Sequence, residues 1–393
     1  MKDYLSHVGI VGGGIAGLTA GCALRLQGIK TVVFERNENT SEYGAGISIS
    51  PNGLRLIDAL GIKDSLLNAS FSPEKVVMRH MGKTIKTLET KVITASRQNL
   101  IKCIHERYLE LGGEVLFDHE YEEFNQEVCE VKFTSGSACK LQHVLACDGI
   151  RSPIRQQHFS SEGPVYSGYS AWRGIGLTDS KNVRFNLGPN SHLVDYPINE
   201  HGKTSFVGIV KTKEETGDSW KIKGSKAELL QDFQTYGEDT CSMIDSSNEV
   251  YKWGIYTRPA LKTMHTKNVT LLGDAAHPMV PFLGQGGCMA IEDAFTFGVL
   301  AGKLEGNFIK VQLAYDQLRL KRNNKIQSSS MMQGRLNHIE NSLLASMRNL
   351  VMKHTPVVSL RTKSIWDFDA DKEITELLKK DKKWSSIEVN SQN

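Results

Sequence analysis

The sequence predicts an α/β protein: a Rossmann-like domain of the glutathione-reductase type, with an inserted β-sheet-rich domain and helices at the C-terminal end. A glycine-rich turn joins a short apolar run to a helical stretch near the N-terminus. Strand-like runs crowd residues 165–257, and a further apolar run at 269–272 leads into a second glycine-rich loop. Strands separated by helical stretches indicate parallel pairing, so we expect one parallel sheet assembled from separated segments.

The composition indicates an ordinary globular protein of about two domains. The chain has 393 residues, 40% of them hydrophobic and 23% charged, and a net charge of +3 that gives no support for a nucleic-acid partner. The seven cysteines form no CxxC pair, so we expect no metal site, no disulfide framework and a reducing, cytoplasmic location. The sequence contains no uncharged apolar run of about 18 residues, so we expect no transmembrane helix. The expected partner is a small-molecule substrate, in a monomer or homodimer.

The first βαβ unit begins almost at once. Residues 7–11 (HVGIV) read as a buried strand, a helix is expected over about 18–28, and residues 30–34 (KTVVF) read as a second strand. Gly28 stands where that helix would stop. Because the two strands are joined by a helix, we expect them to lie parallel.

The turn of this unit carries the pattern Gly12-x-Gly14-x-x-Gly17, with Ile15 and Ala16 inside it. The first glycine permits a tight turn, the second lets a pyrophosphate approach the backbone, and the third lets helix and strand pack closely. Phosphates would lie at the positive end of the helix. Glu35, at the end of the second strand, is where a carboxylate would bind a ribose. The motif alone does not separate FAD from NAD, and a tight turn without a ligand is the alternative.

The remaining chain alternates between helical and strand-like stretches. We expect helices at 52–69, 97–111, 225–236, 287–303 and over much of 312–350, and strands within 74–95, 114–147, 165–257 and 269–272. The predicted nucleotide domain comprises 1–72, 96–163 and 258–340, the β-rich substrate domain comprises 73–95 and 164–257, and 341–393 form a helical segment and tail. Within that segment, residues 343–351 place apolar side chains on one helix face; we expect this face to pack on the body, and a membrane-surface or dimer contact is the alternative.

Two further motifs follow predicted strands. Asp148-Gly149 comes after an apolar run, and Gly273-Asp274 comes after the strand at 269–272. A third glycine-rich stretch, 281–287, then opens a helix. Taken alone, Asp-Gly is an ordinary turn and Gly-Asp can begin a helix. The three motifs in this order are far more specific than any one of them.

With these three motifs the sequence resembles the class A, single-component FAD-dependent aromatic hydroxylases. The resemblance implies non-covalently bound FAD, NAD(P)H as a transient co-substrate and O2, with oxygen transferred to an electron-rich ring through a flavin C4a-hydroperoxide. Residues 169–174 and 192–198 are similar to the salicylate and 6-hydroxynicotinate hydroxylase branch. Residues 284–293 look more like the FAD-dependent urate hydroxylase and zeaxanthin epoxidase branches. The substrate therefore stays open.

The resemblance also implies which residues contact the cofactor. Backbone N–H groups of Gly286 and Gly287, at a predicted helix start, can stabilise negative charge on the reduced flavin. Asp274 is expected at the ribityl chain, and Arg97 at the phosphates. The full expected set is Gly12, Gly14, Ile15, Ala16, Gly17, Glu35, Arg36, Gly46, Arg97, Tyr121, Asp148, Asp274, Gly284, Gly286 and Gly287.

On the substrate side, Tyr196 and His192 are the candidate catalytic residues. Tyr196 could bind a substrate hydroxyl or be a core tyrosine, and His192 could be a base or a satisfied structural histidine. Arg173 could attract a carboxylate or form a structural ion pair. The expected pocket residues are Trp172, Arg173, Phe206, Met279, Pro281 and Phe282.

Two other functions remain possible from the sequence. The same flavin machinery could epoxidise or reduce a lipid-like or polyene substrate. A nucleotide-sensing binding protein without catalysis is the non-enzymatic alternative, and intact flavin motifs argue against it.

Overall fold

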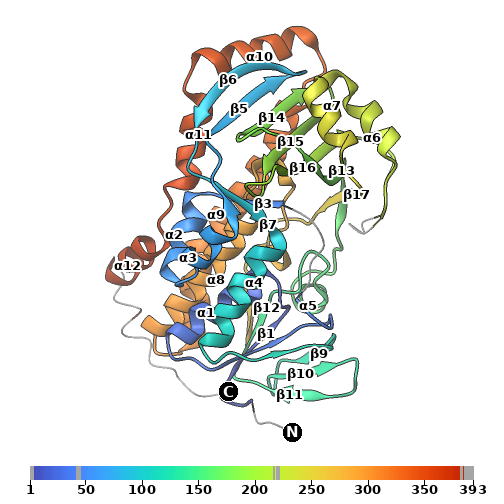
Figure 1. Cartoon of the computed structure of the whole chain (residues 1–393). Coiled ribbons are helices and arrows are strands. Elements are labelled where there is room, and N and C mark those ends of the chain that lie inside the picture. The colour runs from blue at the N-terminus through green and yellow to red at the C-terminus, as the bar shows by residue number, and fades with distance from the viewer. Residues whose placement is uncertain (1–3, 41–45, 216, 218–221, 381–383, 385–393) are drawn as a thin grey trace.

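The computed structural model describes residues 4–40, 46–215, 217, 222–380 and 384. A six-stranded sheet forms the lower part of the molecule in Figure 1, in the order β18-β19-β12-β1-β2-β8. All of its neighbouring pairs are parallel except β18 with β19. The bounds are Val8–Val11 (β1), Thr31–Phe34 (β2), Val115–Leu116 (β8), His143–Ala146 (β12), His265–Thr266 (β18) and Val269–Leu271 (β19). The predicted parallel pairing of the first two strands is confirmed.

Three helices cover this sheet: α1 (Ile15–Leu26), α4 (Arg97–Glu110) and α8 (Gly286–Lys303). The first begins three residues before the expected start, directly after Gly14. Small residues let the helices approach closely: a Cβ on Gly21 would lie 2.6 Å from the Tyr108 ring, and one on Gly298 would lie 2.5 Å from Ala23. This tight packing fixes the N-termini of α1 and α8 relative to the sheet.

A seven-stranded sheet forms the upper part of the molecule, in the order β17-β13-β16-β15-β14-β5-β6 (Figure 1). Its strands are Lys75–His80 (β5), Lys83–Glu89 (β6), Val165–Leu177 (β13), Val183–Gly188 (β14), Ser191–Pro197 (β15), Lys203–Lys211 (β16) and Val250–Thr257 (β17). Helices α6 (Lys226–Phe233) and α7 (Glu238–Asp245) pack on one face over Leu193 and Phe206. Because side chains alternate along a strand, His192, Val194 and Tyr196 face the opposite side from Leu193.

Several elements differ from the expected ones. The helix expected at 52–69 is two helices, α2 (Pro51–Ala59) and α3 (Lys63–Asn68), because Gly61 between them adopts a positive φ of 73°. Residues 93–96 form β7, which pairs with β3 (Gly46–Ile49) and β4 (Ser70–Phe71) rather than with the seven-stranded sheet. The region 114–147 divides between β8 and β12 of the parallel sheet and a separate antiparallel sheet of β9 (Tyr121–Asn125), β10 (Glu130–Phe133) and β11 (Ala138–Lys140).

The C-terminal part contains α9 (Phe308–Asn337), α10 (Ser342–His354), α11 (Val357–Trp366) and α12 (Ala370–Lys380). The expectation that the apolar face of 343–351 packs on the body is wrong: the side chains of that face are exposed, and the buried residue of α10 is Ala345. The exposed ones are Leu343, Leu344, Met347, Leu350 and Val351. No helix in the described part of the chain is long and apolar enough to span a membrane. Most of the tail, residues 385–393, lies outside the described residues.

His143 on β12 gives the fold a predicted pH dependence. Its ring stacks on Phe308 and Phe297, with centroids 4.7 and 5.7 Å away, and Nε2 lies 3.0 Å from Oγ1 of Thr270. Burial lowers the pKa of His143 to about 3. The unfolded chain takes up this proton near pH 6.5 but the folded chain does not, so stability is present above pH 6.5 and is lost as the pH falls.

We expect His143 to contribute a loss of up to about 1.4 kcal/mol in unfolding free energy for each pH unit below 6.5. The measurement is urea unfolding at several values between pH 7.5 and 5 for the wild type and His143→Gln. The variant, which keeps a hydrogen-bonding group for Thr270, should show the shallower dependence. Equal slopes would contradict the assignment.

Candidate active site

One cavity of about 1690 Å³ lies between the two large sheets. Sites for a single small ligand usually measure about 300–1,000 Å³, so this volume suits a dinucleotide together with a second molecule. The glycine loops after β1 and β19 form one end, and β14, β15 and β16 form the other. Residues of α9 and α11 close the side. Segments far apart in the chain therefore meet around a single space.

The loop after β1 owes its shape to its glycines. Gly12 has a φ of 107°, and a Cβ there would lie 2.3 Å from the carbonyl oxygen of Cys147. A Cβ on Gly17 would lie 1.9 Å from the carbonyl oxygen of Gly12. Gly14 lines the cavity, as Gly12 does, but it has different surroundings from both other glycines, because a Cβ there would meet no atom within 4 Å. Two glycines thus form the turn, and the third leaves open space at the N-terminus of α1.

Glu35 lies at the end of β2 and lines the cavity, as its position in the sequence predicts. Its carboxylate accepts hydrogen bonds from the backbone N–H of Gly13 at 2.7 Å and of Asn37 at 2.9 Å. The side chain therefore fixes the glycine loop, and a carboxylate oxygen can accept further bonds.

The Asp148-Gly149 motif braces the cavity from the end of β12. Oδ2 of Asp148 accepts a hydrogen bond of 3.3 Å from the N–H of Ile154, and burial raises the pKa of this carboxyl to about 6. The buried guanidinium of Arg155, in α5 (Pro153–His158), donates to the carbonyl oxygens of Ala275, Ala276 and Pro259. Arg155 thus ties this motif to the Gly273-Asp274 loop. Sequence reasoning missed Arg155, although it is the second arginine, after Arg151, to follow Asp148-Gly149.

The Gly273-Asp274 loop is held from below by Asp293 of α8. Oδ2 of Asp293 accepts a 3.0 Å hydrogen bond from the N–H of Gly273 and contacts Nε2 of His277. Burial alone would raise the pKa of Asp293, but the neighbouring His277 and Arg319 hold it well below its usual range. Asp274 is presented to the cavity on this fixed loop.

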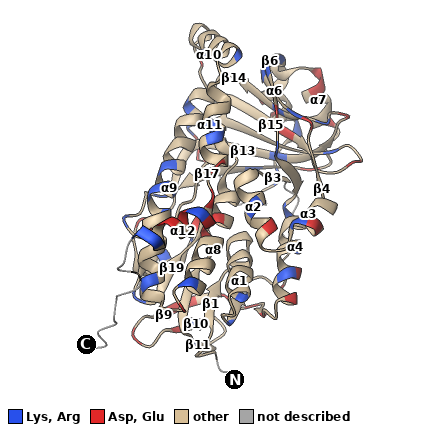
Figure 2. Cartoon of the chain, turned by 90° about the vertical axis from the view of Figure 1, so that its left-hand side faces the viewer, with Lys and Arg blue, Asp and Glu red and all other residues tan. Residues whose placement is uncertain are grey.

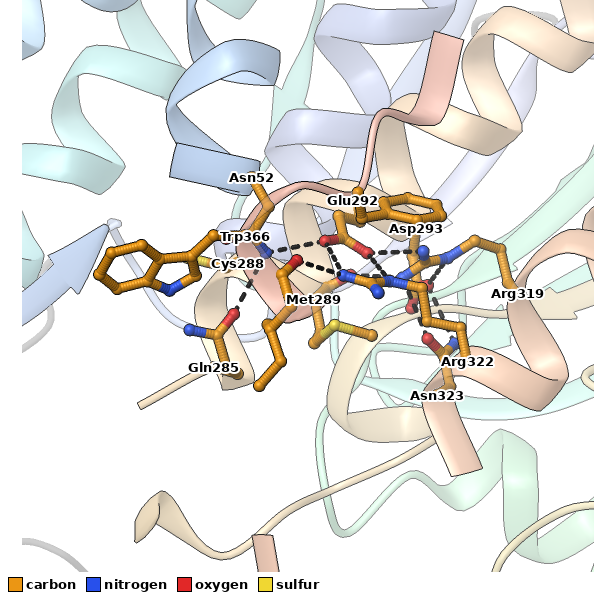
Figure 3. Close-up of polar contacts among 12 residues, drawn as sticks. Asn52, Gln285, Cys288, Met289, Glu292, Asp293, Arg319, Arg322, Asn323 and Trp366 are labelled. Carbon is orange, nitrogen blue, oxygen red and sulfur yellow. Dashed lines mark hydrogen bonds and ion pairs between the residues drawn. The ribbon is translucent and has the colours of Figure 1, made fainter. Parts of the chain in front are cut away.

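Asp293 belongs to a buried ionic cluster that joins α8, α9 and α2 (Figure 3). Arg319 donates to Glu292 at 2.6 Å and to Asp293 at 2.8 Å, and all three side chains are fully buried. Arg322 and Asn52 each donate to Glu292 at 2.8 Å. Figure 2 shows charged residues of both signs gathered where α8 and α12 meet. The cluster fixes the start of α8 beside the glycine loop.

The predicted cofactor residues converge. All of them line the cavity except Gly17, which packs behind its loop. A Cβ on Gly286 would have only Met279 Cγ nearby, at 4.0 Å, so the backbone at the start of α8 is open to a ligand. Open backbone at two helix N-termini is what a phosphate and an anionic ring require, so the residues fit FAD. Gly44 and Ala45, which directly precede the predicted cofactor residue Gly46, lie outside the described residues.

The candidate catalytic pair lies at the other end of the cavity. His192 and Tyr196 both line it from β15. Burial raises the pKa of Tyr196 to about 12. A Cβ on Gly46 would lie 2.5 Å from the Tyr196 ring, so the glycine permits the close approach of β3 to β15. Nδ1 of His192 lies 2.5 Å from Nε2 of His338, a residue that sequence reasoning missed because it follows a distant helix.

Three of the six expected pocket residues do not line the cavity. Trp172 and Phe206 lie on the other face of the sheet under α6 and α7, where Nε1 of Trp172 donates to Asp232 at 2.8 Å. Strand alternation explains the error for Phe206, because successive side chains face opposite sides of the sheet and the next residue, Val207, lines the cavity. Arg173 lies 5.9 Å from the ring of Trp253 instead. Met279, Pro281 and Phe282 do line the cavity.

Comparison with known proteins agrees with this geometry. Residues 6–326 match the family described as FAD binding domain. A 3-amino-4-hydroxybenzoate 2-monooxygenase of Streptomyces cremeus is 30% identical over 348 residues, covering 82% of this chain and 85% of that protein. A 3-hydroxybenzoate 6-hydroxylase of Klebsiella oxytoca is 26% identical, covering 88% and 91%.

Solved structures show the same fold. A salicylate hydroxylase substrate complex superposes with a TM-score of 0.80 at 22% identity, covering 96% of this chain and 99% of the other. Klebsiella pneumoniae HpxO complexed with FAD and uric acid gives 0.80 at 20% identity, covering 95% and 96%. Fold, site and relatives define an FAD-dependent flavoprotein monooxygenase. The chain belongs to the FAD-binding-domain family, because the match spans most of its length.

Proposed function

We propose that the protein hydroxylates a small aromatic or heteroaromatic substrate held between the flavin loops and His192 and Tyr196 of β15. One oxygen atom of O2 enters a ring C–H bond and the other leaves as water, with two electrons from NAD(P)H and one proton from solvent. The observation that carries the proposal is that a single cavity holds both the three-loop cofactor site and the β15 side chains.

The loops hold the cofactor in distinct ways. The N-terminus of α1 beside Gly14 would receive the pyrophosphate, and Glu35 would accept a hydrogen bond from a ribose hydroxyl. Arg36, Arg97 and Tyr121 would contact the adenosine and phosphate part. Asp274 would bind the ribityl chain, and the N–H groups of Gly286 and Gly287 would offset negative charge on the flavin ring. Bound FAD supplies the hydride acceptance and oxygen activation that no side chain can provide.

The substrate end excludes water and orients the ring. Val194, Val207, Ile209 and Phe185 form an apolar wall that removes solvent from the reacting atoms. Tyr196, like any tyrosine, keeps its proton at neutral pH, and burial raises its pKa further to about 12, so we expect it to serve as a hydrogen-bond donor rather than a base.

The test is turnover by the purified holoenzyme with phenols, hydroxybenzoates, hydroxypyridines and purines. We expect substrate-stimulated NAD(P)H oxidation with O2 uptake, and a product that gains one oxygen atom, labelled when heavy-isotope O2 is supplied. Reduction of the substrate without oxygen incorporation, or a protein that binds no FAD, would refute the proposal. The relatives give no support to epoxidation or reduction.

The proposal also covers the domain boundaries, the cellular location and the oligomeric state. We propose that 1–72, 96–163 and 258–340 act as the cofactor domain, 73–95 and 164–257 as the substrate domain, and 341–393 as a C-terminal segment. All seven cysteines are free, which supports a reducing, cytoplasmic location. We propose that the protein is a monomer or a homodimer, as expected from the sequence.

A further inference from the structure

Two buried histidines meet at the substrate end of the cavity. His192 lies on β15, and His338 follows the last residue of α9. Nδ1 of His192 lies 2.5 Å from Nε2 of His338, and the side chains are 1% and 6% exposed. The ring of Phe185 stacks on His192, and Phe282 contacts both imidazoles. Aromatic side chains therefore pack around the two imidazoles and keep them within hydrogen-bonding distance of each other.

Both rings are neutral. Burial lowers the pKa of His192 well below its usual value, and His338 lowers it further. Burial lowers the pKa of His338 to about 3, with Lys211 and Arg348 acting in the same direction. Each ring therefore carries one N–H, and one of the two facing nitrogens must hold the proton of the hydrogen bond.

The direction of this hydrogen bond follows from the far side of His338. Its Nδ1 is buried and has no hydrogen-bond partner among the described residues. If His192 donated, the proton of His338 would sit on that Nδ1, and a buried N–H without an acceptor is rarer in proteins than a buried acceptor without a donor. If His338 donates from Nε2, its Nδ1 needs only to hold a bare lone pair. We therefore take His338 as the donor.

This direction decides what His192 offers the cavity. With Nδ1 accepting, the proton of His192 sits on Nε2. His192 lines the cavity. Several side-chain nitrogen and oxygen atoms of the described residues are fully buried without a hydrogen-bond partner, and Nε2 of His192 is not one of them. The ring thus presents a fixed N–H donor to the substrate, which differs from both the base and the structural histidine that the sequence left open.

We propose that His192 donates Nε2–H to a ring-bound oxygen of the substrate, either a phenolate or a ring carbonyl, and that His338 is the positioning residue that holds this tautomer. The inference rests on the proposed function and names its substrate class: an oxygen-bearing aromatic ring whose other edges are apolar enough to lie against Val194, Val207 and Ile209. A donor at this point favours the anionic oxygen, which increases electron density in the ring to be hydroxylated.

The first experiment reads the tautomer without any turnover. In holoenzyme labelled with ¹⁵N-histidine, the His192 signals are identified by their loss in His192→Gln. We expect a pyrrole-type Nε2 and a pyridine-type Nδ1. His338→Gln, whose amide N–H can replace the donor, should keep this pattern, and His338→Leu should lose it. His143→Gln, a buried histidine outside the cavity, should leave it unchanged. The reverse pattern in the wild type would overturn the proposal even if hydroxylation were established.

The second experiment uses 1-naphthol as the probe and follows its ionisation by ultraviolet absorbance on binding to the holoenzyme. We expect bound 1-naphthol to ionise at a lower pH than free 1-naphthol. We also expect about tenfold weaker binding of the anion to His338→Leu but a change within about twofold for His338→Gln. A raised pKa of bound 1-naphthol, or failure to bind it while other ring compounds are hydroxylated, would contradict the ring-oxygen assignment. Absence of hydroxylation with a lowered pKa would instead refute the proposed function alone.

Discussion

Replacement of Arg319 by methionine is expected to lower the free energy of unfolding by about 3–5 kcal/mol, the largest stability effect that the structure predicts. Arg319 is fully buried and bonds Glu292 at 2.6 Å and Asp293 at 2.8 Å. Without it, two buried carboxylates lose their most buried cation. Because Asp293 also accepts from the N–H of Gly273, we expect weaker FAD binding as well. Urea unfolding and FAD titration of the refolded apoprotein measure the two effects.

Two comparisons isolate the cause. Arg322→Met removes a cation that bonds the same Glu292 but is 13% exposed, so it should cost less, about 1–2 kcal/mol. Adding Glu292→Gln to Arg319→Met removes one of the stranded charges and should recover part of the loss. A loss below about 1 kcal/mol for Arg319→Met would show that the cluster contributes little.

Replacement of Gly14 by valine is expected to reduce FAD affinity at least about a hundredfold, close to 2.7 kcal/mol, while the apoprotein remains folded. Gly14 needs no special backbone angle, and a Cβ there would meet no protein atom within 4 Å. The added side chain would instead occupy the cavity at the N-terminus of α1, where the pyrophosphate is proposed to lie. The measurements are flavin fluorescence titration for affinity and circular dichroism for folding.

Gly163→Val is the matched control, because a Cβ there also meets nothing within 4 Å and the residue does not line the cavity. It should bind FAD as the wild type does. Gly17→Val should behave differently again: its Cβ would lie 1.9 Å from the carbonyl oxygen of Gly12, so misfolding is expected rather than selective loss of cofactor. Unchanged FAD affinity in Gly14→Val would place the pyrophosphate elsewhere.

The cofactor side could be read from the sequence because its signals are local. A glycine turn between a strand and a helix requires a particular backbone path, so the position of Gly12, Glu35 and Asp274 follows from neighbouring residues. The substrate side depends on contacts across the sheet. A register shift of one residue placed Phe206 on the wrong face, and nothing near His192 in the sequence indicates that His338 would meet it.

The buried ion pairs could not be predicted from the sequence either. In the sequence, Glu292 and Asp293 look like ordinary polar positions of a helix. Only the fold shows that Arg319, in the next helix, supplies the opposite charge to both carboxylates. The exposed apolar face of α10 was misjudged for a related reason: periodicity predicts that a helix has an apolar side but not what covers it.

The parallel sheet has a consequence for synthesis on the ribosome. β12 pairs with β1 on one edge and with β19 on the other, and β19 leads into the Gly273-Asp274 loop. Until this late segment leaves the exit tunnel, the nascent chain has an open β-edge and an unfinished nucleotide pocket. A chain terminated before residue 265 would therefore be a substrate for chaperones and proteases, and cofactor loading must await the emergence of residues 273–287 from the ribosome.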